Sequence, residues 1–301
     1  MPARDLALLT ESAREAGRIA LRYWRRDPQV WDKGGEHGPV TEADLAVNDM
    51  LKAKLLAARP DYGWLSEETP DSADRLAVDT VFIIDPIDGT RAFVAGEETW
   101  AHSLAVAHKG KITAGVVYLP AIDRIYTASE TSPPMKDGQP IAVSGRDRLE
   151  GSNILTTKAN MVPEKWPGGV PEITRSFRAS LAYRMCLAAE GRFDGMLNLR
   201  SCYTWIEIRR ELGLDGACDR GYDLPLGGAY VGQGTTMSIN GVPWGVAVPG
   251  TGRSVYVGLT LVQVFLLSSL WFVGIDDLMT PYEALAHAFA LSHTHAVGLV
   301  L

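Results

Sequence analysis

Apolar residues recur along the first 60 positions with the spacing of helices. One stripe runs at alternating steps of three and four and comprises Leu6, Leu9, Ala13, Ala16, Ala20 and Tyr23. A second stripe lies between Thr41 and Pro60 and comprises Ala43, Val47, Leu51, Leu55 and Ala58. These stripes predict two amphipathic helices, the second begun by a Thr41 cap and ended before Pro60. The segment 32–39 is rich in turn-forming residues and predicts a loop.

A different pattern begins at residue 81. Residues 81–84 form a short apolar run followed by Asp85-Pro86, which indicates a buried strand that ends at a turn. Residues 103–107, 112–118 and 124–128 predict further strands joined by short turns. Residues 180–190 have a helical pattern ended by Gly191, which suits a left-handed cap. Together these elements predict layers of helices and sheets rather than a strict βαβ repeat.

Composition and charge narrow the class of protein. The chain has 301 residues, 46% of them hydrophobic and 22% charged, which predicts buried cores and about two domains. Its net charge of −7 gives no electrostatic reason to expect a nucleic-acid polymer as partner. Three cysteines without a C-x-x-C pair predict neither a disulfide framework nor a thiolate zinc site. Charged residues interrupt every apolar run near the N-terminus, so we expect a cytoplasmic protein.

Charge is unevenly distributed along the chain. Residues 206–301 hold four basic and eight acidic residues, whereas all lysines lie at or before Lys165. Residues 254–275 contain no charge and are long enough to cross a bilayer. Polar residues and a strand-like alternation within this stretch favour a soluble interpretation over a membrane span. The composition therefore changes near Trp205.

The segment 85–90, with the sequence Asp-Pro-Ile-Asp-Gly-Thr, carries the strongest chemical signal. Asp85 and Asp88 flank a proline-stiffened turn and can be directed at one point, where Glu67 can join them from the end of another predicted strand. Three converging carboxylates repel one another unless a cation lies between them. Oxygen ligands without histidine or cysteine favour Mg²⁺. Gly89 permits close backbone approach, and its amide and that of Thr90 can face an anion.

Three segments in order resemble the motifs of the inositol monophosphatase family, which are magnesium-dependent, lithium-sensitive phosphatases. The segments are 41–44 (Thr-Glu-Ala-Asp), 64–68 (Trp-Leu-Ser-Glu-Glu) and 85–90, and the similarity continues through 115–118 and 189–194. It covers about residues 1–205. The resemblance implies an α/β, layered α+β fold of the inositol monophosphatase and sugar phosphatase type. Residues 1–145 would form an N-terminal subdomain with the metal site and 146–205 the start of a second, followed by an atypical tail at 206–301.

The same resemblance implies a metal site with two or three Mg²⁺ ions. Glu67, Asp85 and the carbonyl of Ile87 would bind the first ion. Asp85 and Asp88 would bind a second. Together the ions would activate water and stabilise the leaving oxygen during direct attack on phosphorus.

Catalytic and substrate-binding roles are likewise implied by the resemblance. Asp44 and Thr90, together with Glu67, form the implied catalytic group, in which the first two orient and deprotonate the attacking water. Asp88, Gly89, Thr90 and Arg91 would bind the substrate. Weaker assignments are Lys33, similar to a mobile-loop lysine that recruits a further water, and the substrate-side candidates Arg184 and Asp194.

The sequence departs from the family pattern directly after Trp205. The family's last motif, Trp-Asp, supplies a ligand to the second metal, but Ile206 stands at the aspartate position here. Glu207 is offset by one residue, which rotates its side chain by about 100° on a helix, so loss of the ligand is favoured over replacement. A replaced C-terminus, as a shifted reading frame would produce, explains both this loss and the change in composition. A catalytically impaired pseudophosphatase that binds metal or phosphate is therefore the alternative function.

The substrate is left open among three members of one chemical class. An inositol monophosphate, a 3′(2′),5′-bisphosphate nucleotide and histidinol phosphate are all small phosphate monoesters. A basic residue at Arg91 favours the bisphosphate nucleotidase and histidinol-phosphatase branches, although a surface cation is an equal interpretation. We expect a small phosphorylated molecule as the partner; a homodimer and a membrane contact through 254–275 stay open.

Overall fold

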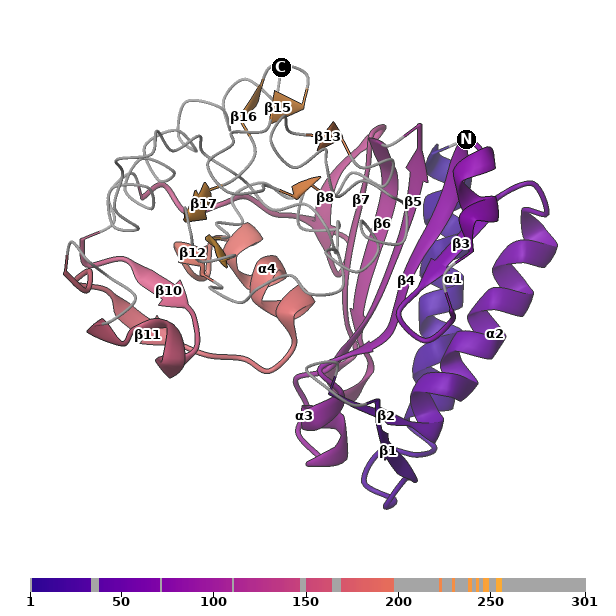
Figure 1. Ribbon diagram of the computed structural model, residues 1–301, viewed down its shortest axis with the longest axis horizontal. Coiled ribbons are helices and arrows are strands. Elements are labelled where there is room, and N and C mark those ends of the chain that lie inside the picture. Colours follow the sequence, from indigo (N-terminus) through magenta and orange to yellow (C-terminus); the bar gives the residue numbers. More distant parts are fainter. Residues whose placement is uncertain are drawn as a thin grey trace.

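A seven-stranded sheet forms the middle of the structure, with helices on both of its faces (Figure 1). The computed structural model describes residues 2–33, 38–70, 72–109, 111–146, 150–163 and 169–197, and six short strands between residues 222 and 255. The strands lie in sequence order, with β3 parallel to β4 and every later neighbour antiparallel. Their bounds are β3 (Gly63–Ser66), β4 (Thr80–Asp88), β5 (Ala101–His108), β6 (Lys111–Leu119), β7 (Arg124–Ser129), β8 (Ser132–Lys136) and β9 (Gln139–Pro140).

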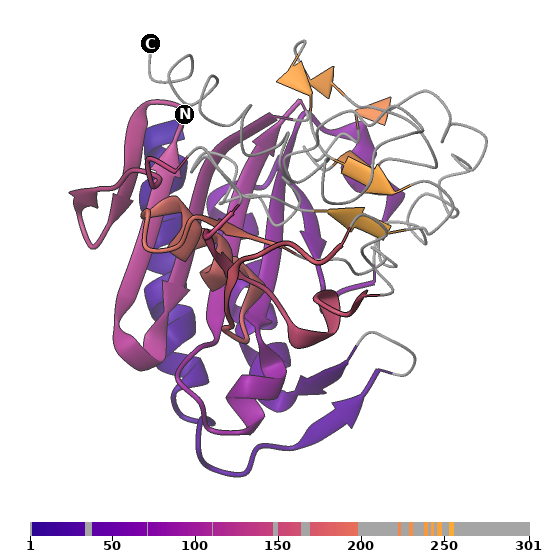
Figure 2. The same cartoon turned by 90° about the vertical axis from the view of Figure 1, so that its left-hand side faces the viewer.

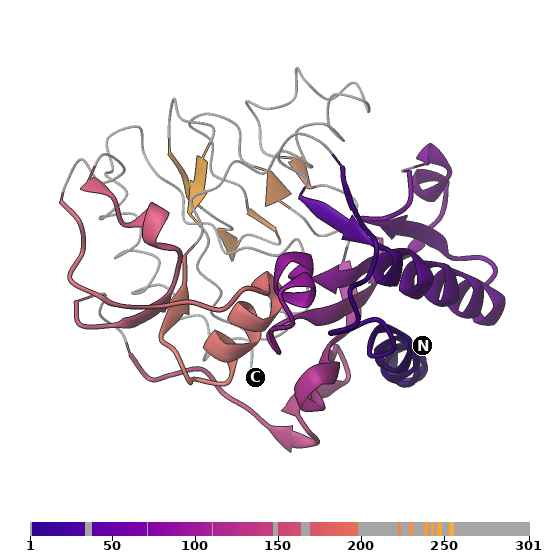
Figure 3. The ribbon, with the colours of Figure 1, turned by 90° about the horizontal axis from the view of Figure 1, so that it is seen from below.

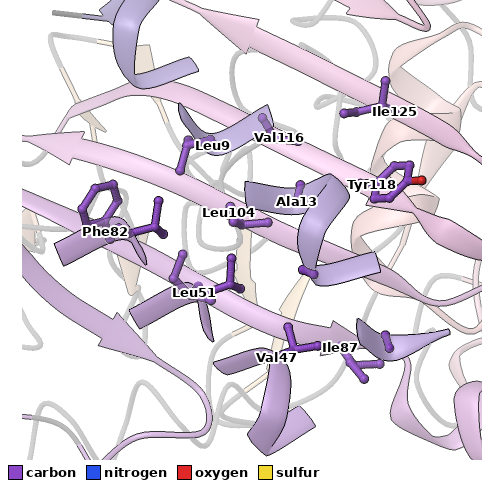
Figure 4. Packing of buried hydrophobic residues seen from close by; sticks show 14 of the residues in the cluster. Leu9, Ala13, Val47, Leu51, Phe82, Ile87, Leu104, Val116, Tyr118 and Ile125 are labelled. Carbon is purple, nitrogen blue, oxygen red and sulfur yellow. The ribbon is translucent and has the colours of Figure 1, made fainter. Parts of the chain in front are cut away.

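Two long helices cover one face of this sheet. They are α1 (Pro2–Ala20) and α2 (Glu42–Ala58), and their apolar stripes pack on β4, β5 and β6 (Figure 4). Leu9, Leu51 and Leu104 are fully buried there. Each such side chain contributes roughly 1.5–3 kcal/mol relative to an exposed one. Both helices predicted from the periodicity are confirmed, and Thr41 caps α2 in a reciprocal capping box with Asp44.

The opposite face carries α4 (Leu181–Ala189) and a second, smaller sheet (Figure 2). Here β11 (Thr174–Ser176), β10 (Asn153–Leu155) and β12 (Gly195–Met196) run parallel in that order. Ala101 and Val117 of the large sheet pack against Tyr183 and Leu187 of α4 in one apolar cluster. The layered mixture of helices and sheets predicted from the sequence is what the described residues form, whereas the proposed boundary at residue 145 stays a prediction.

Short elements lie at one end of the large sheet. The hairpin β1 (Val30–Asp32) and β2 (Pro39–Thr41) and the one-turn helix α3 (Thr90–Val94) meet beside the end of β4 (Figures 1 and 3). The segment 32–39, predicted as a loop, has its ends in this hairpin. The 3₁₀ turns with described bounds are η1 (Ala73–Ala77), η2 (Pro120–Ile122) and η3 (Lys158–Asn160).

The described strands beyond residue 197 form three short antiparallel pairs. They are β13 (Tyr222–Asp223) with β14 (Ala229–Tyr230), β15 (Ser238–Ile239) with β16 (Val242–Pro243), and β17 (Val246–Val248) with β18 (Arg253–Val255). Of the helices in the described ranges, none has the length and apolar character needed to cross a bilayer. The stretch 254–275 lies almost wholly outside those ranges, so its interpretation stays open.

Gly191 ends α4 at a tight approach to the chain after β9. Its φ is +70°, and a Cβ there would lie 2.8 Å from the carbonyl oxygen of Ala142 and 3.0 Å from the amide nitrogen of Ser144. We expect Gly191→Ala to lower the free energy of unfolding by about 1–3 kcal/mol, because it combines backbone strain with a collision against rigid backbone. Gly138→Ala is the control, since Gly138 has a φ of +78° and nothing within 4 Å of the added Cβ. Equal losses for both variants in urea denaturation would contradict the role of the collision.

Candidate functional site

Asp85 and Asp88 lie on the same face of β4 although they are three residues apart. In a regular strand, residues i and i+3 point to opposite faces. The ladder to β5 pairs Asp85 with Ser103 and Asp88 with Ala101, so β4 holds one extra residue in a β-bulge. The strand therefore continues through Asp85-Pro86, and the prediction that it ends before them was wrong. Because of the bulge, Ile87 packs toward α1 and α2, while both carboxylates face the α4 side.

Asp88 is held directly by the start of α4. One carboxylate oxygen, Oδ2, accepts hydrogen bonds from the Ser180 hydroxyl at 2.5 Å and the Ala182 amide at 2.7 Å. Ser180 is itself the N-cap of α4, because its hydroxyl accepts from the Tyr183 amide at 2.9 Å. Burial raises the pKa of Asp88 despite these hydrogen bonds. Asp88 of the large sheet thus accepts hydrogen bonds from the first residues of α4, which lies in the next layer.

Gly89 makes the close approach between these layers feasible. It adopts a φ of +95° as the N-cap of α3, and a Cβ there would lie 3.3 Å from both the Ser180 Cα and the Thr99 carbonyl oxygen. Any side chain would therefore strain the backbone and press against α4. The next residue, Thr90, lies beside Asp44 of α2.

Thr90 and Asp44 form a second polar pair at this point. The Thr90 hydroxyl donates to the Ile87 carbonyl at 3.0 Å and lies 3.4 Å from Asp44 Oδ1. The other oxygen of Asp44 accepts from the Thr41 amide at 2.8 Å and the Thr41 hydroxyl at 2.5 Å. Asp44 is fully buried, and this burial raises its pKa to about 6. Its proton affinity is therefore tuned to a range useful for general base chemistry.

Glu67 and Glu68 follow β3 and meet Lys33 from the hairpin loop. The Lys33 ammonium lies 2.6 Å from Glu68 Oε1 and 3.4 Å from Glu67 Oε1. Burial raises the pKa of Glu68 to about 7, although the ion pair opposes that shift. Glu67 keeps 48% of its side chain exposed. Lys33 is thus placed directly against the predicted ligand Glu67.

Asn48 is a residue of this site that the sequence analysis missed. It lies one turn after Asp44 on α2 and is buried. Its Oδ1 accepts from the Ser66 hydroxyl at 2.7 Å, and its Nδ2 donates to the Thr69 hydroxyl at 3.1 Å. These two partners flank Glu67, so Asn48 fixes the turn that carries this carboxylate. A polar residue within the apolar stripe of α2 was the signal available in the sequence.

The remaining predicted site residues differ in their positions relative to the acidic residues. Arg184 of α4 is buried and its charge acts on Asp88, with its guanidinium 5.2 Å from the Phe177 ring. Arg91 is exposed on α3. The Asp194 carboxylate accepts from the amide of Asn153 on β10 at 2.8 Å and pairs with Arg146, which precedes that strand, at 3.2 Å. The predictions concerning Ile206 and Glu207 lie outside the described residues.

The charges of four acids act together on Asp85. Burial raises the pKa of Asp85 well above its usual range, and the neighbouring charges of Glu67 and Asp88 raise it further, with smaller effects of Asp44 and Glu68. Within the described ranges, no three His, Cys, Asp or Glu side chains are arranged so that they could hold a metal ion as they lie. The donor chemistry nevertheless fits a hard divalent cation, because it consists of oxygen atoms whose mutual repulsion such an ion would relieve.

The raised pKa of Asp44 predicts a pH-dependent stability of the metal-free protein. The carboxyl has an ordinary pKa of 3.8 and a folded pKa of about 6, so the folded protein keeps a proton that the unfolded chain releases. The stability contribution is full below the unfolded value and is lost as pH rises through the folded one. We expect wild-type protein in chelator to lose more thermal stability between about pH 4 and pH 7 than Asp44→Asn. Identical pH profiles in thermal unfolding would refute this assignment.

Comparisons with known proteins agree with the layered fold. The family model described as "Inositol monophosphatase family" matches residues 2–205. The chain is 31% identical over 228 residues to a histidinol-phosphatase of Chlorobaculum parvum, covering 71% of this chain and 85% of that protein. It is 36% identical over 213 residues to an inositol-1-monophosphatase of Mesorhizobium japonicum, covering 63% and 74%. The crystal structure of the extragenic suppressor protein suhB from Bartonella henselae superposes with a TM-score of 0.56 at 30% identity, covering 65% and 80%.

Proposed function

Because the chain belongs to the inositol monophosphatase family of phosphatases, we propose that it hydrolyses a small phosphate monoester with Mg²⁺ as its cofactor. The observation that carries this proposal is the bulge in β4, which turns Asp85 and Asp88 to one face beside Glu67. Asp85 is buried and lies beside the charges of Glu67 and Asp88, so it is costly to ionise. Binding of a divalent cation offsets that cost, which supports a metal-dependent role.

The metal ligands that we propose are those that the family resemblance implies. Glu67, Asp85 and the Ile87 carbonyl would hold one ion, and Asp85 with Asp88 would hold a second. When bound, such ions act as Lewis acids that activate water and stabilise the charge developing on the leaving oxygen. Asp88 keeps one carboxylate oxygen for this purpose, because its Oδ2 is engaged by α4.

Asp44 and Thr90 would handle the proton of the attacking water. The Thr90 hydroxyl lies between Asp44 Oδ1 and the Ile87 carbonyl and can orient a water molecule through its own lone pair. With a pKa of about 6, Asp44 can accept the released proton near neutral pH. Direct attack of water would then release phosphate without a covalent enzyme intermediate. The substrate phosphate would lie against Gly89 and Thr90, with Arg184 as the nearby buried cation.

The experiment is a phosphate-release assay on the full chain with an inositol monophosphate, a 3′(2′),5′-bisphosphate nucleotide and histidinol phosphate. We expect release from at least one of them that requires Mg²⁺ and is inhibited by Li⁺. The assay separates the three substrates, among which Arg91 favours the bisphosphate nucleotide and histidinol phosphate. Folded protein that releases no phosphate from any of them would exclude the proposal for this substrate class.

The sequence at Ile206 favours a second candidate function, an impaired phosphatase that binds Mg²⁺ without efficient turnover. Ile206→Asp tests it, because this substitution restores the carboxylate of the family motif. A gain in phosphate release with unchanged fold would support the impaired state of the natural chain. Equal activity of both proteins would show that the aspartate is dispensable here.

A further inference from the structure

We propose that His102 is a positioning residue that holds the β4 bulge from the face opposite the carboxylates, and so directs Asp85 and Asp88 to one point. The expected effect on Mg²⁺ binding rests on the proposed function, whereas the contact between His102 and the bulge does not. His102 lies on β5 between Ser103 and Ala101, the partners of Asp85 and Asp88. It therefore faces the two residues, Pro86 and Ile87, that make up the bulge.

The contact between His102 and the bulge is direct. A short hydrogen bond joins the Nδ1 atom of His102 to the carbonyl oxygen of Pro86. A carbonyl oxygen only accepts, so Nδ1 carries the proton and donates it. Pro86 has no amide hydrogen and lies where the β4–β5 ladder is interrupted. The imidazole thus supplies a hydrogen bond to the backbone at the interruption of the ladder.

The surroundings of the ring hold it in this orientation. His102 is fully buried, and its ring lies 5.6 Å from the Trp100 ring and 6.4 Å from the Tyr118 ring, measured between centroids. Among the described residues, no hydrogen-bond partner reaches the other ring nitrogen, Nε2. A buried nitrogen without a partner is costly, and an apolar side chain would avoid that cost. The histidine is therefore explained by its bond to Pro86 rather than by packing alone.

The bond has a consequence for the site because the bulge determines where Asp88 points. If residues 85–88 paired with β5 without a bulge, Asp88 would face α1 and α2 instead of α4. His102 anchors the residue next to Asp85 and two before Asp88, and it does so without contact to metal or substrate. Groups that orient metal ligands in this way typically change metal affinity or activity about 10- to 100-fold when they are removed.

The test compares three variants by Mg²⁺ titration calorimetry and by amide hydrogen exchange of residues 87–90 in metal-free protein. His102→Leu removes the donor at similar volume. His102→Asn keeps a donor, because the asparagine amide nitrogen and His Nδ1 are both bonded to Cγ. Trp100→Phe is the packing control, since it alters the same aromatic cluster and keeps the His102 donor. We expect Mg²⁺ affinity to fall about 10- to 100-fold in the leucine variant only, with faster exchange at the bulge.

Several results would overturn the inference. One is a folded His102→Leu variant whose Mg²⁺ affinity and amide exchange equal those of wild-type protein. Another is a loss of Mg²⁺ affinity in His102→Asn or Trp100→Phe equal to that in His102→Leu, because it would assign the effect to packing. Nitrogen NMR of the wild-type imidazole gives an independent measure that needs no variant to fold: a proton on Nε2 instead of Nδ1 contradicts the bond to Pro86. If wild-type protein binds no Mg²⁺, the proposed function fails, and exchange at residues 87–90 together with the tautomer still decides the role of His102.

Discussion

Replacing Asp85 by asparagine is expected to lower Mg²⁺-dependent phosphate release at least about a thousand-fold while the protein stays folded. The several kcal/mol of transition-state stabilisation that a Lewis acid supplies depend on ligands that hold the ion. Burial raises the pKa of Asp85, and the neighbouring charges of Glu67 and Asp88 raise it further. Removing its charge in the metal-free protein relieves this repulsion, so the free energy of unfolding in chelator should stay equal or rise.

Asp79→Asn is the matched control for this variant. Asp79 directly precedes β4, is exposed, and pairs with Lys109 at 3.4 Å on the surface. Surface pairs of this kind contribute little to stability, so activity and unfolding should match those of wild-type protein. Phosphate release, Mg²⁺ calorimetry and urea denaturation of both variants give the comparison. Turnover of Asp85→Asn within about tenfold of wild-type would remove Asp85 from the metal site.

Asp88 has two proposed roles, as the acceptor at the start of α4 and as a metal ligand, and we expect different substitutions to separate them. Asp88→Ala removes the acceptor for Ser180 and Ala182 at the start of α4, so we expect a loss of about 1–3 kcal/mol in the free energy of unfolding. Asp88→Asn keeps a carbonyl oxygen for these donors and should cost less. Both variants lack the charge, so phosphate release should fall at least about a thousand-fold in each.

Ser180→Ala distinguishes the capping of α4 from metal binding by Asp88. It removes one donor to Asp88 and the cap of α4, but leaves the carboxylate in place. We expect a stability loss similar to that of Asp88→Ala with a much smaller loss of Mg²⁺ affinity. If Asp88→Asn destabilised the protein as much as Asp88→Ala, the charge rather than the acceptor would hold α4.

The sequence predicted the elements whose patterns are local. Periodicity found α1 and α2 because each buries one apolar stripe, and the Thr41 cap and the Gly191 end were visible as residue types with special backbone preferences. The motif at 85–90 identified acids of the candidate site. The layered fold followed from the order of strands and helices together with the family resemblance.

Long-range geometry explains what the sequence could not reveal. Asp85-Pro86 was interpreted as the end of a strand because proline lacks a ladder donor, but the bulge accommodates it and β4 continues to Asp88. Asn48 and His102 were overlooked because their roles depend on partners on other elements, Ser66 on β3 and Pro86 on β4. Asp194 pairs with Arg146, a partner 48 positions away in the chain, and its role as a substrate-side residue stays a prediction. The assignments at Ile206 and Glu207 stay predictions.

The bonds from Asp88 to the start of α4 also have a consequence for synthesis of the chain. Ser180 follows Asp88 by 92 positions. At roughly 5–20 residues per second, the ribosome needs on the order of 5–20 s to supply this partner after Asp88 is made. During that interval the nascent sheet carries neighbouring acids that α4 has not yet covered. The acidic face is therefore completed late in translation, and chains interrupted between residues 90 and 180 are the ones we expect chaperones and proteases to meet with this face open.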